Sequence, residues 1–170
     1  ETFRPNIAVI LNITPDHLDR HKTLEEYADL KGRVSAFQND GDILVLNKDD
    51  ENVMKQGKRS KAKKVFFSLR GKVDDGAYLE DGSMFTCSDG KEKRILSVGD
   101  LKKAMQFQAE NLLSSIAVAT LVNATKSDIA NVAMKFEGLD HRVEWVRTVR
   151  GIDFVNDSKG TNVGALQKSL

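Results

Sequence analysis

The sequence predicts an α/β fold in which a mainly parallel sheet is flanked by helices and carries a small antiparallel insert. Three observations lead to this expectation. Short aliphatic runs are typical of strands that are buried on both faces of a parallel sheet. These runs alternate with segments whose apolar residues recur at helical spacing. Between them lie two strand-like runs joined by Asp81-Gly82, a turn sequence that is typical of hairpins.

The first half of the chain contains two predicted strand–helix pairs. A strand at Ile7–Ile13 is followed by a helix from Thr23 to about Phe37, and Glu26 stands three residues after Thr23, the spacing of a capping box. A second strand covers residues 42–46. The run Asp49-Asp50-Glu51-Asn52, which contains three acids, then caps and charges the first turn of a short helix that ends near Gln56.

The second half continues with strands, then helices, then strands again. The patterns predict a strand at 65–69, a hairpin of 77–80 and 83–87, a strand at 92–98, helices at 107–122 and 127–136, and a hairpin of 143–149 and 152–156 turned at Arg150-Gly151. A polar loop, residues 156–162, then precedes a helix that should begin at Val163.

Gly138-Leu139-Asp140 has the composition of a hinge between two domains. After it, a strand, a polar loop and a helix start follow in the order in which a dinucleotide-binding half domain begins. We therefore expect residues 1–138 to form a central domain and residues 139–170 to begin a C-terminal Rossmann-like domain. Because the chain starts at Glu1 and ends at Leu170, just after a predicted helix start, we expect it to be a piece of a longer protein.

Composition excludes several classes of function. The 170 residues include 26 Lys+Arg and 25 Asp+Glu, a net charge of +1, so no global charge favours nucleic acid or a membrane. The basic run Lys55–Lys64 lacks interleaved aromatic residues and is interpreted as a solvated surface. The single cysteine, Cys87, excludes an internal disulfide and a cysteine-based zinc cluster. With no long apolar run or signal peptide, we expect a cytoplasmic protein.

Polar side chains cluster directly after the first predicted strand, where ligands collect in parallel sheets. They are Asn12, Thr14, Asp16, His17, Asp19 and Arg20. The residue pattern alone leaves other interpretations open. A single His in a turn is often a hydrogen-bonded surface residue, and a Lys on a helix, such as Lys31, is usually solvated. Likewise, Asn111 and Asn162 could cap helices, and Arg142 could pair with Glu137 or Glu144.

Residues 12–20 (NITPDHLDR) resemble the strand-end segment of the Mur ligases, the ATP-dependent amino-acid ligases of peptidoglycan synthesis. The resemblance implies that His17 binds a divalent metal ion, Mg²⁺ or Mn²⁺. It also implies that Lys31, on the following helix, is carbamylated and supplies oxygen ligands to the metal site, so that both residues are catalytic.

Two further segments are similar to nucleotide-binding parts of the same family. Residues 107–111 (FQAEN) match a helix start whose Asn, here Asn111, recognises the adenine of ATP; Glu110 and Ser114 depart from the family pattern. Residues 138–144 (GLDHRVE) match an interdomain segment whose Arg, here Arg142, contacts the ATP phosphates. A guanidinium suits that role because its planar fork can hold phosphate oxygens bidentately.

Residues 156–162 (NDSKGTN) are similar to the Asn-Asp-Ser-Lys-Ala-Thr-Asn signature of one family branch, whose members add D-glutamate to UDP-N-acetylmuramoyl-L-alanine. Gly160 stands where Ala is usual. The resemblance implies that Asp157 holds the ribose of ATP. It further implies that Ser158, Lys159 and Thr161 contact the substrates, and that Lys159 also takes part in catalysis.

The implied reaction is ATP-dependent amide formation through an acyl phosphate, carried out by a monomer without nucleic-acid or membrane partners. A phosphate-binding loop of the type G-x-x-x-x-G-K-[ST] does not occur in residues 1–170. We therefore expect that loop upstream in a longer protein and expect these residues alone to be inactive. Two alternatives stay open: a non-catalytic nucleotide-binding module, and a ligase like the folylpolyglutamate synthetases, which share the fold.

Overall fold

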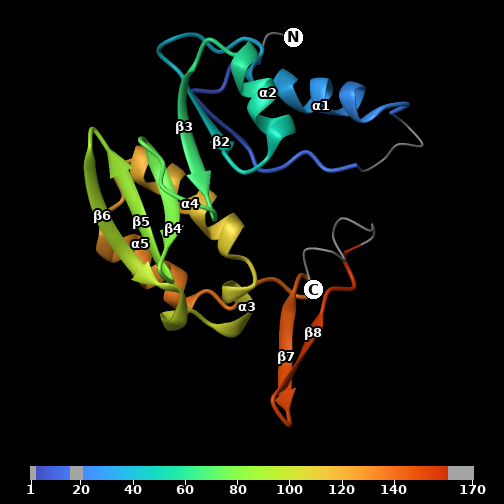
Figure 1. Cartoon of the computed structure of the whole chain (residues 1–170), viewed down its shortest axis with the longest axis vertical. Helices are drawn as coiled ribbons and strands as arrows, with labels where there is room; N and C mark the ends of the chain where they lie inside the picture. Colours follow the sequence, from blue (N-terminus) through green and yellow to red (C-terminus); the bar gives the residue numbers. More distant parts are fainter. Residues whose placement is uncertain (1–2, 16–20, 161–170) are drawn as a thin grey trace.

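The computed structural model describes residues 3–15 and 21–160. Its elements form a sheet with helices on both faces and a separate hairpin near the C-terminal end (Figure 1). In chain order they are β1 (Ile7–Ile10), α1 (Leu24–Gly32), η1 (Arg33–Ser35), β2 (Ile43–Asn47), α2 (Glu51–Arg59), β3 (Lys63–Ser68), β4 (Gly76–Glu80), β5 (Ser83–Ser88), β6 (Lys91–Ser97), η2 (Val98–Asp100), α3 (Lys103–Gln106), α4 (Ala109–Leu121), α5 (Lys126–Lys135), β7 (Glu144–Val149) and β8 (Ile152–Asn156).

The main sheet contains six strands in the order β1-β2-β3-β4-β5-β6. β1 through β4 pair in parallel, whereas β5 pairs with β4 and β6 in the antiparallel sense. The predicted α/β class with a mainly parallel sheet is therefore confirmed. The antiparallel strands extend the same sheet, so the expected small insert is continuous with it.

The aliphatic strands are covered on both faces, as their composition predicts. Along β2, Leu44 and Leu46 pack in one cluster with Ala28 of α1 and Val53 of α2. Val45, whose side chain points the other way, packs in a second cluster with residues of α4 and α5. Figure 1 shows the same division, with α1 and α2 on one side of β2 and β3, α4 on the other side, and α5 behind β5 and β6.

The parallel pairing of β3 with β4 is made without a helical crossover. The two strands overlap only from Phe66 opposite Gly76 to Ser68 opposite Tyr78. Residues 69–75 therefore need to return the chain only from the end of β3 to the level of Phe66, where β4 begins. Gly76 makes this approach possible. Its φ is +135°, and a Cβ atom there would lie 1.8 Å from the carbonyl oxygen of Phe66.

Two predicted helix ends are wrong. α1 ends at Gly32, not near Phe37, because the chain tightens into η1, where the Ser35 hydroxyl donates to the Gly32 carbonyl at 3.0 Å. α2 continues to Arg59, beyond the predicted end at Gln56, because Gly57 is buried and packs closely against the Leu46 side chain. The first half of the basic run Lys55–Lys64 therefore forms the last turn of a helix.

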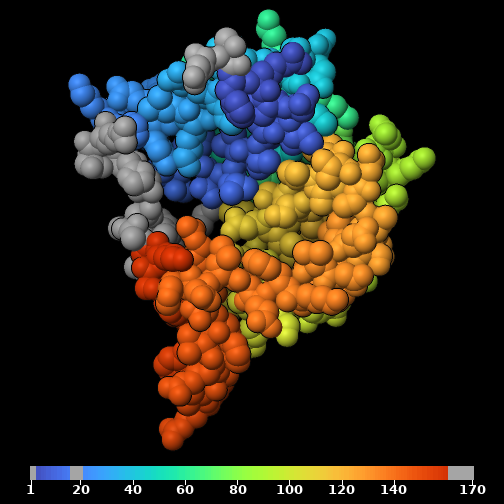
Figure 2. All heavy atoms as spheres, turned by 180° about the vertical axis from the view of Figure 1, so that it is seen from behind, coloured from blue at the N-terminus to red at the C-terminus, as the bar shows by residue number. Residues whose placement is uncertain are grey.

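The helix expected at 107–122 forms as α4, Ala109–Leu121, and the short helix α3, Lys103–Gln106, precedes it and was not predicted. The hairpin β7–β8 forms as predicted and turns at Arg150 and Gly151, which both have positive φ. It projects from the body of the molecule, as Figure 2 shows in orange and red. The helix expected at Val163 lies outside the described residues. None of the helices in the described ranges is long and apolar enough to cross a membrane.

Replacing Gly76 with Ala should destabilise the fold strongly, because the new Cβ atom would clash with backbone and the positive φ would be strained. We expect a loss of more than about 3 kcal/mol in the free energy of unfolding, measured by urea denaturation. Gly71→Ala is the matched control, since a Cβ atom at Gly71 meets no atom within 4 Å. Equal midpoints for the two variants would contradict this interpretation of the β3–β4 pairing.

Candidate functional site

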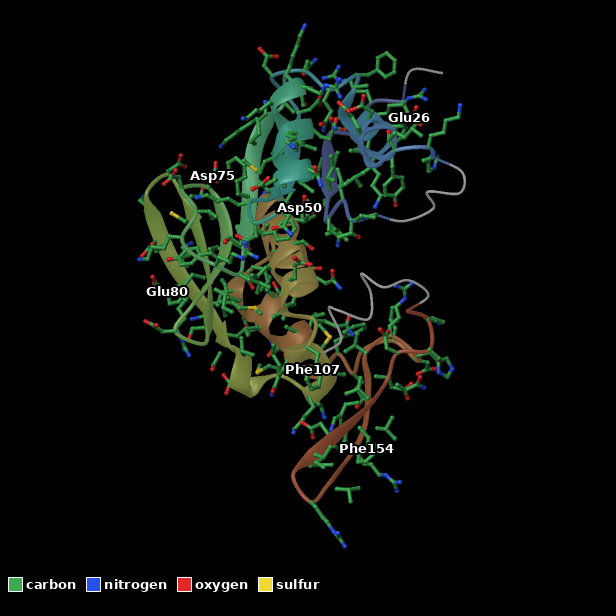
Figure 3. The ribbon with its side chains drawn as sticks, turned by 45° about the vertical axis from the view of Figure 1, so that its right-hand side comes forward. Glu26, Asp50, Asp75, Glu80, Phe107 and Phe154 are labelled. Carbon is green, nitrogen blue, oxygen red and sulfur yellow. The ribbon has the colours of Figure 1, made fainter. Side chains whose placement is uncertain are left out.

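The backbone that follows β1 is held by side chains from the segment after β2. The Asn47 amide donates to the Leu11 carbonyl at 3.0 Å, and the Asn52 amide donates to the Ile13 carbonyl at 3.3 Å. The Ile13 N–H donates to the Asp50 carboxylate at 2.8 Å. We call residues 47–52 the edge segment. It lies at the carboxyl edge of the parallel strands, where Figure 3 shows Asp50 on the side that faces the hairpin.

The acids of the edge segment have different roles. Asp50 caps α2, as predicted, because its carboxylate accepts from the N–H groups of Asn52 and Val53 at 2.9 and 3.0 Å. Asp49 instead binds the end of β3. Its carboxylate accepts from the Ser68 hydroxyl and the Leu69 N–H, each at 2.7 Å. The edge segment thus connects the ends of β1 and β3.

Lys31 points toward this edge from α1. Thr23 caps the helix, as predicted, by accepting from the Glu26 N–H at 3.1 Å. One turn of helix separates Tyr27 from Lys31, whose ammonium lies 5.0 Å from the centre of the Tyr27 ring. The same ammonium donates to the Asn12 carbonyl at 3.4 Å. Although exposed, Lys31 is therefore directed at the strand end.

The metal site predicted from His17 cannot be built from the described residues. His17 lies outside them, in the stretch 16–20 that follows Pro15. Within the ranges 3–15 and 21–160, no group of three or more His, Cys, Asp or Glu side chains could hold a metal ion. Of the two residues predicted to serve a metal ion, the structure therefore describes Lys31 alone.

Asn111 lies in the first turn of α4 with an exposed side chain. The N-cap residue of α4 is Gln108, so the alternative in which Asn111 caps this helix is wrong. Glu110, which departs from the family pattern, accepts from the buried Asn47 amide at 2.9 Å. Ser114 is buried and donates to the Asn111 carbonyl at 2.7 Å, which engages its hydroxyl within the helix.

Arg142 is joined to the same helix start through its backbone. The Gln108 side-chain amide donates to the Arg142 carbonyl at 3.0 Å, while the Arg142 side chain is exposed. The predicted alternative partner, Glu144, accepts from the His141 N–H at 2.9 Å and from the Asn156 amide at 3.2 Å. His141 and Val143 on either side have positive φ, +66° and +48°, a conformation rare for a β-branched residue such as Val.

The polar loop after β8, residues 156–160, packs against residues 141–143, and we use hinge for the whole segment 138–143. The Val143 N–H donates to the Asp157 carboxylate at 3.1 Å, and the Lys159 N–H donates to the His141 carbonyl at 3.1 Å. A Cβ atom on Gly160 would lie 2.6 Å from an oxygen of Asp157, so Ala at this position would require the carboxylate to move. Lys159 is exposed, as is Ser158, whose N–H donates to the Asn156 side chain. Thr161 lies outside the described residues.

The hairpin is anchored to α3 by Asp153. Its carboxylate accepts from the Lys103 ammonium at 2.8 Å, from the Trp145 indole N–H at 3.3 Å and from the Thr148 hydroxyl. Because all three interactions favour the ionised form, with Lys103 the largest, they lower the pKa of Asp153 from 3.8 to about 2. Figure 3 shows Phe107 at the base of the hairpin and Phe154 on it.

A sequence model of the Mur ligase middle domain matches residues 1–119. The chain belongs to the Mur ligase family. A protein named UDP-N-acetylmuramoylalanine--D-glutamate ligase from Thermoanaerobacter sp. (strain X514) is 39% identical over 168 residues, which are 99% of this chain and 37% of that protein. A protein of the same name from Streptococcus equi subsp. zooepidemicus is 42% identical over 170 residues, 100% of this chain and 36% of that protein. The chain thus spans little more than a third of these relatives.

Solved Mur ligase structures share the fold. MurF from Acinetobacter baumannii superposes with a TM-score of 0.72 at 14% identity, over 97% of this chain and 36% of that chain. MurF from Thermotoga maritima in complex with ADP gives 0.67 at 21% identity, over 98% and 38%. The resemblance to the Mur ligases that the motifs predict is therefore confirmed for the family and the fold.

The structure brings the predicted residues into two groups. Lys31 lies at the end of β1, whereas Asn111, Arg142, Asp157 and Lys159 lie along the start of α4 and the hinge that contacts it. The two groups are connected through Leu11, Asn47 and Glu110. Sequence reasoning missed the connecting role of Asn47; its position at the end of an aliphatic strand, among polar residues, is the signal that could have revealed it.

The anchoring of the hairpin should depend on acid pH. The folded pKa of Asp153 lies below its ordinary value, so its contribution is complete above pH 3.8 and is lost as pH falls toward about 2. Trp145, the single tryptophan, reports the change through its fluorescence. We expect Lys103→Ala to move the midpoint upward and Asp153→Asn to abolish the step. A step that survives in Asp153→Asn would contradict the assignment.

Proposed function

We propose that residues 1–170 form the middle part of an ATP-dependent ligase that adds D-glutamate to UDP-N-acetylmuramoyl-L-alanine in peptidoglycan synthesis. The observation that carries this proposal is similarity along the whole chain to relatives that bear that name, at 39% and 42% identity. The geometry supports it because Asn111 and the hinge residues approach one another at the carboxyl edge of the sheet, where ligands of α/β folds bind.

In this proposal the nucleotide lies between α4 and the hinge. The exposed Asn111 amide offers both a donor and an acceptor to the adenine. Asp157 accepts hydrogen bonds from the ribose hydroxyls while its carboxylate also holds the Val143 N–H. Arg142, fixed through its carbonyl by Gln108, directs a permanent positive charge to the phosphates.

Lys31 and His17 serve a Mg²⁺ or Mn²⁺ ion, which would neutralise phosphate charge during the reaction. An ammonium beside a divalent cation would repel it, so Lys31 must be neutral there. Carbamylation by CO₂ turns the amine into a carboxylate-like group with the oxygen ligands that Mg²⁺ prefers. The direction of Lys31 toward Asn12 at the strand end supports this role.

The reaction we propose has two steps. ATP phosphorylates the L-alanine carboxylate of the UDP-sugar substrate, which gives an acyl phosphate and ADP. The amine of D-glutamate then attacks the acyl carbon, phosphate leaves, and the amide forms. Both steps gather anions, so Arg142 and Lys159 stabilise them by charge, and Ser158 and Thr161 orient the substrates.

We further propose the domain boundary near Leu139, a monomer, and action in the cytoplasm. Ile129 and Ala133 of α5 pack in the core of the main sheet, which supports a central domain that extends to residue 138. The hairpin β7–β8 forms its own two-stranded sheet, which supports a second domain from residue 139.

Amide formation by the complete ligase tests the proposal. UDP-N-acetylmuramoyl-L-alanine is supplied with ATP and, in turn, D-glutamate, L-glutamate, L-lysine and D-alanyl-D-alanine, and the products are identified by mass spectrometry. In a separate reaction, a folate substrate is supplied with ATP and L-glutamate. We expect product with D-glutamate alone. Product from folate would support the folylpolyglutamate synthetase alternative, and nucleotide binding without any product would support the non-catalytic module.

Substitutions at Lys31 test whether this residue acts as a carbamate or only as a positive charge. In the complete ligase, Lys31→Ala should lose at least about 100-fold in kcat and recover partly when a short carboxylate such as acetate is added. Lys31→Arg should stay inactive, because a guanidinium keeps its charge and cannot form the carbamate. Lys55→Ala, at an exposed lysine of α2, is the control and should match the wild type. Full activity of Lys31→Arg would refute the carbamate.

Arg142 and Asp157 should affect different kinetic constants. Arg142→Ala should lower kcat about 100-fold, because phosphate charge develops in the transition state. Asp157→Ala should mainly raise the KM for ATP, by about tenfold, since a ribose contact exists before and during reaction. The control for Arg142 is Arg147→Ala on β7, where the guanidinium lies 6.0 Å from the Phe154 ring centre. Unchanged kinetics for both site variants would show that the hinge is structural only.

A further inference from the structure

Asn47 connects three parts of the fold through one buried side chain, which is 1% exposed. Its amide nitrogen donates to the Leu11 carbonyl at 3.0 Å and to the Glu110 carboxylate at 2.9 Å. Its amide oxygen accepts from the Asp49 N–H at 2.9 Å. The end of β1, the edge segment and the first turn of α4 therefore meet at a single group.

Burial of the Asn47 amide is energetically unfavourable unless all of its hydrogen bonds form at the same time. Asn47 follows the apolar run 43–46 and occupies the last position of β2, where an unpaired donor would lose its contacts with water. Because both amide hydrogens and the oxygen are used, the three elements can satisfy the group in only one relative arrangement. Displacement of α4 along the sheet would break the bond to Glu110.

Glu110 is well placed to receive that bond. It is the acidic residue in the first turn of α4, where the helix macrodipole favours a negative charge. The N-cap residue, Gln108, makes no capping bond with its side chain, which instead donates to the Arg142 carbonyl. The first turn of α4 is thus tied to the sheet by Glu110 and to the hinge by Gln108.

We propose that Asn47 and Glu110 are positioning residues for the nucleotide. Their hydrogen bond fixes the start of α4 against the strand ends, and thereby sets the distance from Asn111 and the hinge to the end of β1. This inference rests on the proposed function, in which Asn111 binds adenine. It assigns to Glu110 a role that depends on the reach of its oxygen atoms toward Asn47, not on its charge.

Three substitutions of Glu110 separate reach from charge in the complete ligase. Glu110→Gln keeps an acceptor at the same distance but removes the charge, so it should stay close to the wild type. Glu110→Asp keeps the charge but withdraws the oxygens by about 1.5 Å, roughly one carbon–carbon bond. Glu110→Ala removes both. We expect the Asp and Ala variants to raise the KM for ATP about tenfold, with kcat within about twofold of the wild type.

Direct titration of each variant with ADP provides a second measurement that does not depend on turnover, and thermal unfolding shows whether the variants remain folded. Glu51→Ala is the matched control, since Glu51 is the exposed acid in the first turn of α2. It should leave the KM and the ADP affinity unchanged.

Reduced ADP affinity in the Asp and Ala variants, with rescue by Gln, would support the proposal. The reverse order, in which Asp matches the wild type and Gln matches Ala, would overturn it in favour of charge. Lower thermal stability with unchanged ADP affinity would overturn it in favour of a structural role. Failure of the proposed function is a distinct result, because the wild-type ligase would then form no amide with D-glutamate.

Discussion

The polar side chains of the edge segment, residues 47–52, are the interaction on which the candidate site depends. Where the parallel strands end, the backbone of β1 and β3 still needs hydrogen-bond partners. Asn47, Asp50 and Asn52 supply them to the backbone after β1, and Asp49 supplies one to the backbone after β3. The strand ends are thereby held in fixed positions next to Lys31 and the start of α4.

The opposite edge of the sheet has a different chemistry. There the buried Asp42 carboxylate accepts from the Arg4 guanidinium at 2.7 Å and from the Asn39 N–H at 2.8 Å. These bonds, with that from Arg4 the larger, keep the pKa of Asp42 below its usual value. The amino edge is thus closed by internal pairing, whereas the carboxyl edge presents Lys31, Asn111, Arg142 and Lys159 with exposed side chains. This asymmetry favours the carboxyl edge as the place for anionic ligands.

Local patterns predicted what depends on local physics. Several features could be predicted because each depends on residues within a few positions of one another. They are the aliphatic run of β2, the caps Thr23 and Asp50, and the turn at Arg150-Gly151. The end of α1 was predicted wrongly, since the tightening at Ser35 competes with a continuing apolar pattern. The helix at 107–122 was predicted correctly and forms as α4, whereas the short helix α3 that precedes it was not predicted.

Contacts between distant residues could not be predicted from spacing. The parallel pairing of β4 with β3 depends on the close approach at Gly76, and the bond between Asn47 and Glu110 joins residues that are 63 positions apart. For the site, the family motifs select Asn111, Arg142 and Asp157, and the structure places all three near the start of α4. The motifs did not include Asn47, whose side chain connects the end of β1 to the start of α4.

The most direct test of the account is a crystal structure of the complete ligase with ADP and Mg²⁺. We expect the adenine within hydrogen-bond distance of Asn111 and the ribose beside Asp157. The phosphates should be directed toward Arg142 and toward Lys31, and Asn47 should still be bonded to Glu110. Nucleotide bound elsewhere, for example at the amino edge beside Arg4 and Asp42, would contradict the claim that the carboxyl edge is the functional site.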